Sequence, residues 1–138
     1  MAKVEYFDRL NAIHYWGRYE QWIKFFLKTV GAAAEMTLRR VEAAIVLRDR
    51  YIATINSENK DVKHLLNAYT KVEKHIFLNV ASLAVAIGVS YNTGARIMKK
   101  LVGMGIMRLL KAQARNRVYF YAELLDVAGI TINATYID

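Results

Sequence analysis

The sequence predicts a mainly α-helical protein with a small β-hairpin, and three observations support this fold class. The chain of 138 residues contains no proline, so the strongest breaker of helices is absent. Apolar side chains recur at helical spacing over most of residues 6–74. Two β-like runs then flank the polar segment AQARN, between residues 106 and 121. We therefore expect an N-terminal helical hairpin, followed by a domain of short helices and two paired strands.

The composition is that of a folded chain without disulfides. Hydrophobic residues make up 55% and charged residues 23%, which provides enough apolar surface for a packed core. The absence of cysteine excludes disulfides, thiol nucleophiles and thiolate metal sites. The N-terminus lacks the apolar core of a signal peptide, and polar side chains interrupt the longest uncharged stretch, residues 75–95. We expect a cytoplasmic protein that does not enter a membrane.

Residues 1–55 are expected to form the helical hairpin. A short first helix carries apolar side chains at helical spacing, namely Tyr6, Phe7 and Leu10. Gly17 suits its C-terminal cap, and a long periodic run follows from near Glu20 to about Ile55. One face of this second helix carries Ile23, Leu27, Val30, Ala34, Leu38, Val41, Ile45 and Ile52. The short helix cannot cover so long a stripe, so we expect the rest of a larger parent protein or a second copy of the chain, in a homodimer, to cover the remainder.

An aromatic cluster lies around the turn of this hairpin. Its members are Tyr15, Trp16, Tyr19, Trp22, Phe25 and Phe26. We interpret the cluster as ordinary core packing, with an oligomer interface as the alternative.

The polar segment NSENKD, residues 56–61, is expected to be a linker between the hairpin and a second domain, residues 62–138. Asp61 is expected to cap the N-terminus of a helix that runs from Val62 to about Lys74. The buried side of that helix should carry Leu65, Leu66, Tyr69 and Val72.

The next segment predicts two helices joined by a tight turn. After a short β-like run at residues 76–78, Asn79 can cap the helix VASLAVAIG, which Gly88 can end in a left-handed conformation. Ser90 can cap the following helix, YNTGARIMKKLVGMG. Its side toward the first helix carries Gly94, Ile97, Met98 and Leu101, and its outer side carries Asn92, Arg96, Lys99 and Lys100. Such a pair is a helix-turn-helix.

The two β-like runs, IMRLLK and RVYFY, follow this helix directly and convert the pattern into a winged helix-turn-helix. From Lys74 to Ala122, both included, the chain has eight basic side chains and no acidic one. A solvated basic face would explain this charge, but its place on the helix and the wing favours double-stranded DNA as the partner. The residues expected to contact DNA are Ser90, Tyr91, Asn92, Arg96, Lys99, Lys100, Arg115 and Arg117.

Two segments resemble the C-terminal portion of Fic-family proteins. YFDRLNAIHYWGRYEQWIKFFLKTV is similar to the helices after the family's catalytic loop, and LAVAIGVSYNTGARIMKKLVGMGIM with RNRVYFY is similar to its winged-helix tail. The loop that transfers AMP, His-Pro-Phe-x-x-Gly-Asn-Gly-Arg, is missing from this proline-free chain. The resemblance thus implies a tail without the activity. Gly94 stands where such tails usually place Ala, at an expected cost of up to about 1 kcal/mol of helix stability.

No catalytic or metal-binding constellation is visible. His14, His64 and His75 lack the spacing of metal ligands. Gly103 and Gly105 follow a helix, so they are better explained as its termination than as a dinucleotide loop. We expect no enzyme activity, no metal and no cofactor.

The leading hypothesis is a sequence-specific DNA-binding winged-helix module, transcriptional in role and homodimeric. The alternative is a protein-recognition or regulatory module that serves a Fic AMP-transferase, whose catalytic core would be the partner. Tyr91, Tyr119 and Tyr121 would then anchor the interface.

Overall fold

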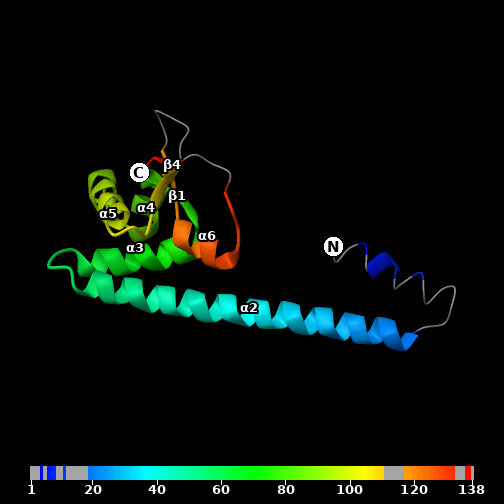
Figure 1. Cartoon of the computed structure of the whole chain (residues 1–138). Helices are drawn as coiled ribbons and strands as arrows, with labels where there is room; N and C mark the ends of the chain where they lie inside the picture. The colour runs from blue at the N-terminus through cyan, green and yellow to red at the C-terminus, as the bar shows by residue number, and fades with distance from the viewer. Residues whose placement is uncertain are drawn as a thin grey trace. The chain divides into compact units, whose positions relative to one another are not determined.

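The computed structural model of the chain describes residues 4, 6–8, 11, 19–110, 117–132 and 136–137. The chain forms two compact units, Met1–Val41 and Glu42–Asp138. The predicted fold class is confirmed, because the protein is mainly helical and carries a small antiparallel sheet as the wing of a helix-turn-helix (Figure 1). Within the described ranges, no helix is both long and apolar enough to cross a membrane.

Helix α2 (Tyr19–Asn56) confirms the long helix predicted from near Glu20 to about Ile55. Pairs one turn apart support it locally in the first unit: Lys24 contacts Glu20 at 2.5 Å, and Arg39 contacts Glu35 at 3.4 Å. Residues 6–8 of the predicted first helix are helical, whereas the turn predicted at Gly17 lies outside the described residues.

The described part of the second unit contains four further helices. Helices α3 (Val62–Lys74), α4 (Val80–Ile87) and α5 (Tyr91–Gly103) confirm the helices predicted from the sequence. Helix α6 (Ala122–Ala128) was not predicted, and it ends at Gly129 in a left-handed conformation with a φ of 72°. Helix α4 packs against both α3 and α5, which places the helix-turn-helix on α3.

The sheet has four antiparallel strands in the order β1-β3-β2-β4. Strands β2 (Arg108–Leu110) and β3 (Val118–Phe120) form the predicted hairpin, with Leu109 opposite Tyr119. Strand β1 (Phe77–Asn79) lies one residue beyond its predicted position and pairs with β3. Strand β4 (Tyr136–Ile137), which was not predicted, extends the sheet on the other side of β2.

The compact units divide the chain at a different place from the predicted segments 1–55, 56–61 and 62–138. Residues from Glu42 onward belong to the second unit, so the C-terminal part of α2 is one of its core helices. The reason is packing: Leu47, Tyr51 and Ile55 are buried in the same cluster as the apolar faces of α3, α4 and α5. The predicted linker therefore is a tight connection between two helices of one core.

Candidate nucleic-acid interface

Three side-chain and backbone devices fix the helix-turn-helix, and the sequence predicted each of them. Asn79 caps α4, since its side-chain oxygen accepts a hydrogen bond from the Ser82 amide at 2.7 Å. Gly88 ends α4 with a φ of 71°. Ser90 caps α5 and accepts a hydrogen bond from the Thr93 amide at 3.3 Å. The direction in which α5 leaves the turn is thereby set locally.

The two helices approach each other most closely at Gly94. A Cβ added to Gly94 would lie 2.7 Å from the Cβ of Ala84 and 3.1 Å from its Cα. Any side chain at this position would force α4 and α5 apart. The sequence placed Gly94 on the side toward the first helix and predicted a helix-propensity cost there, and the structure adds the contact that requires glycine.

The predicted inner face of α5 is confirmed. All four residues predicted on this face are buried, namely Gly94, Ile97, Met98 and Leu101. On the outer face, Asn92 and Lys99 are exposed, and Tyr91 at the start of the helix is 63% exposed. Helix α5 thus separates an apolar packing face from a polar outer face, as base or phosphate recognition requires.

Asp61 was expected to cap α3, and this is wrong. Its backbone is left-handed, with a φ of 69°, and its side chain makes no capping hydrogen bond to α3. The carboxylate instead contacts the guanidinium of Arg96 and lies 3.3 Å from Nζ of Lys100. A left-handed residue does not have the extended backbone of an N-cap, so the side chain is available for a partner outside its own helix.

Lys100 is held by a second set of acceptors in the loop between α2 and α3. Its Nζ donates to the carbonyl oxygen of Lys60 at 3.0 Å and to Glu58 at 3.4 Å. The side chain of Lys100 is only 28% exposed. Two of the predicted DNA-contacting cations, Arg96 and Lys100, are therefore already paired within the chain.

The two cations keep the Asp61 carboxylate charged. Burial alone would raise its pKa, but hydrogen bonds from Lys100 and Arg96 outweigh burial and hold the pKa of Asp61 below its ordinary value. The carboxylate is consequently ionised at neutral pH, which keeps the loop attached to α5 by charge-assisted hydrogen bonds.

The wing contributes further cations. Arg117 is exposed just before β3, and Arg115 lies outside the described residues. Arg108 is exposed at the start of β2, opposite Phe120, and sequence reasoning did not include it among the site residues. Its place as the first charged residue of the β-like run IMRLLK could have indicated it.

Tyr121 cannot anchor a protein interface, which corrects one part of the alternative hypothesis. Its side chain is 1% exposed, and its hydroxyl lies 3.0 Å from that of Tyr69. The ring also packs against Tyr51, with a centroid separation of 6.0 Å. Tyr121 is thus a core residue that joins the sheet to α2 and α3, whereas Tyr119 is partly exposed.

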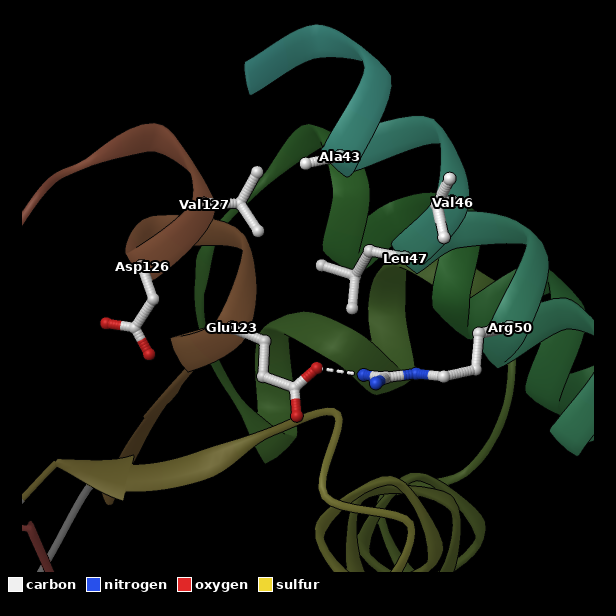
Figure 2. A pocket seen from close by; sticks show the side chains of 7 residues that line it. All are labelled: Ala43, Val46, Leu47, Arg50, Glu123, Asp126 and Val127. Atoms are coloured by element: carbon white, nitrogen blue, oxygen red, sulfur yellow. Dashed lines mark hydrogen bonds and ion pairs between the residues drawn. The ribbon is translucent and has the colours of Figure 1, made fainter. Parts of the chain in front are cut away.

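A shallow hollow of about 340 Å³ lies between α2 and α6. Figure 2 shows Arg50 and Glu123 facing each other across one side of it, and the two form an ion pair. The remaining lining residues are Ala43, Val46, Leu47, Asp126 and Val127. The ion pair fastens α6 to α2.

No protein-family model matches this sequence, and no curated protein matches it either. Among solved structures, the chain is similar to the crystal structure of RV1404 from Mycobacterium tuberculosis, with 20% identity over 64% of this chain and 67% of that chain and a TM-score of 0.41. It is also similar to a MarR family transcriptional regulator from Silicibacter pomeroyi DSS, with 15% identity over 86% of this chain and 74% of that chain and a TM-score of 0.40. The resemblance to Fic-family proteins stays a prediction.

Proposed function

We propose that this chain is a sequence-specific DNA-binding protein of the winged-helix type, with a role in transcription. The observation that carries the proposal is the outer face of α5, where an exposed amide and cations lie on a helix whose entry is fixed by the Ser90 cap. A wing with the exposed Arg117 follows this helix in the chain. A helix in the major groove and a wing on the adjacent backbone require this layout.

The proposal gives separate roles to the two parts of the surface. Asn92 and Arg96 lie early on α5 and would contact base edges, where an amide pairs with adenine and a guanidinium with guanine. Ser90 and Tyr91 would lie near phosphate at the helix N-terminus. Lys99, Arg115 and Arg117 would contact phosphate, which gives affinity without sequence preference.

Fluorescence anisotropy on a selected DNA site and a scrambled site, at three salt concentrations, tests this division. Asn92→Ala should cost about 1–3 kcal/mol on the selected site and little on the scrambled one. Arg117→Ala should weaken both sites equally and reduce the salt slope by about one unit. Lys24→Ala, which removes a cation of the first unit, is the matched control and should leave both sites unaffected. Equal effects of all three variants would contradict the proposal.

The apolar stripe of α2 supports a homodimer. In the first unit, Leu27 is 61% exposed and Leu38 is 59% exposed, together with Val30 and Val41. Burying large apolar side chains against a second apolar surface is favourable, and a second copy of the chain offers the same apolar stripe. Light scattering at tens of micromolar should give twice the mass of the chain, and selected DNA sites should be inverted repeats with half-sites about 34 Å apart. A monomeric mass would refute this part.

A protein-recognition module that serves a Fic catalytic core is the second candidate, and the exposed ring of Tyr91 favours it. The same titrations separate the two functions. Phosphate contacts give a steep linear loss of log affinity with log salt, whereas an aromatic protein interface depends on salt much less.

A further inference from the structure

The acidic loop between α2 and α3 contacts the outer face of α5 at two of its cations. Asp61 contacts Arg96 and Lys100, and the side chain of Asp61 is only 13% exposed. Lys100 is held in addition by Glu58 and the Lys60 carbonyl. The loop thus supplies three acceptors to one lysine and one to the neighbouring arginine, all outside the helix that is proposed to enter DNA.

The two paired cations differ in what they leave exposed. Arg96 contacts Asp61 through one terminal nitrogen, and its side chain remains 53% exposed. A guanidinium carries five N–H donors in a rigid plane, so a carboxylate at one edge fixes the plane and leaves the other donors available. Lys100 has three donors, and its three acceptors in the loop can occupy all of them.

The backbone of Asp61 shows that this position is set by the fold. Its φ of 69° lies in the left-handed region, which Asp, Asn and Gly tolerate and other residues rarely adopt. The left-handed turn ends the loop immediately before Val62, where α3 begins. The carboxylate is therefore held at α5 by the chain on one side and by two cations on the other.

On the basis of the proposed function, we propose that Asp61 is a positioning residue for DNA recognition, which orients Arg96 toward one base edge and retains Lys100 as a brace. Bidentate recognition of guanine needs two donors in fixed positions, and an unrestrained arginine would exchange between base and phosphate. The carboxylate also removes charge from the phosphate-binding surface. The wild-type protein therefore has fewer effective cations at the DNA than its sequence suggests.

Asp61→Asn tests the positioning role. Asparagine is nearly isosteric and tolerates the left-handed backbone, so the loop can keep its conformation without the charge. Because the bidentate contact discriminates guanine from the other bases, we expect the ratio of scrambled-site to selected-site Kd to fall by about tenfold. We also expect the salt slope to become steeper by about one to two units, since Arg96 and Lys100 become available to phosphate. A purely structural role would not steepen the slope.

Glu73→Gln is the matched control. Glu73 on α3 pairs with Arg48 at 2.9 Å, so this variant makes the same change in net charge away from α5. In this variant the Kd ratio should change by less than about twofold, and the salt slope should change by less than about half a unit. Asp61→Gly, which also suits the left-handed backbone, should reproduce Asp61→Asn and excludes an effect specific to the amide.

The outcomes separate the two proposals. A wild-type protein that binds both DNA sites equally overturns the proposed sequence-specific function and the role of Asp61 with it. A wild-type protein that prefers the selected site, with the same preference in Asp61→Asn, overturns the positioning role alone. A similar loss of preference in Glu73→Gln would also overturn it, because general charge would then be the cause.

Discussion

The two units differ in how far their described leucine side chains are exposed to solvent. In the first unit, Leu27 and Leu38 of α2 each leave more than half of their surface exposed. In the second, Leu65 and Leu83 are 0% exposed, within a core that α2, α3, α4 and α5 build together. The described apolar side chains of the second unit thus form a core of their own, whereas Leu27 and Leu38 of the first unit remain exposed.

Helix α2 contributes to both units, so the exposure of its side chains can be compared along one helix. Leu27 and Leu47 lie on the same α2, but only Leu47 is buried. Helical periodicity identifies which side chains share a face, and it does not identify what covers them. The local support in the first unit comes from pairs such as Glu20 with Lys24 and from good helix formers such as the run of alanines at residues 32–34.

The largest expected effect comes from truncating a leucine in each unit. Leu65→Ala should lower the free energy of unfolding of the second unit by about 2–5 kcal/mol, because it leaves a cavity in a fully packed cluster. Leu38→Ala is the matched change on the exposed stripe, and in the monomer it should alter that free energy by less than about 0.5 kcal/mol. Chemical denaturation measures both. A large effect of Leu38→Ala in the monomeric state would show that the stripe is covered within the chain.

Gly94→Ala should have the next largest effect on the second unit. The new methyl would lie within 2.7 Å of the Ala84 Cβ, so α4 and α5 must separate, at a cost of about 1–3 kcal/mol. Ala84→Gly should restore part of the loss in the double variant, because it removes the clashing atom. Gly103→Ala on the same helix has open space around its Cβ and serves as the control.

That control should be neutral or slightly stabilising, by up to about 1 kcal/mol, as expected for alanine in place of glycine in a helix. A loss in Gly103→Ala as large as that in Gly94→Ala would mean that backbone conformation, not close packing, determines the effect. Thermal unfolding followed by circular dichroism provides the comparison.

The features that could be predicted from the sequence depend on residues close together in the chain. The side-chain oxygens of Asn79 and Ser90 cap helices by accepting hydrogen bonds from amides three residues away, and Gly88 ends a helix at its own position. Short-range interactions of this kind leave a signature in sequence order. The inner and outer faces of α5 were predictable for the same reason.

The features that were missed depend on contacts between distant segments. Asp61 has the sequence context of an N-cap, but its partner Arg96 lies 35 residues later. At Gly94 the sequence predicts a loss of helix stability, whereas the close approach of Ala84 is visible only in the structure. Helix α6 has only seven residues, too few for a periodic pattern, and it is stabilised by contacts such as Arg50 with Glu123. Only the fold brings these groups together.

The effect expected to be smallest at neutral pH, where it is absent, concerns three tyrosines that join the elements of the second unit. Tyr51 of α2, Tyr69 of α3 and Tyr121 before α6 have ring centroids 6.0–6.2 Å apart. Burial raises the pKa of the Tyr51 hydroxyl to about 12. Burial also raises the pKa of Tyr121 above its ordinary value, and the hydrogen bond with Tyr69 adds to this shift. The folded state therefore holds these protons more tightly than the unfolded chain does.

This difference predicts a loss of stability in alkali. Below pH 10 both states keep the tyrosine protons, so the stabilisation is fully present. Between pH 10 and 12 the unfolded chain releases them first, and the free energy of unfolding falls by up to about 1.4 kcal/mol per pH unit for each such group. Tyr121→Phe should make this decline shallower, whereas Tyr91→Phe, at an exposed ring, should not. Denaturant midpoints measured from pH 9 to 12 decide the point, and parallel declines in all three proteins would mean that the buried tyrosines do not determine the alkaline limit.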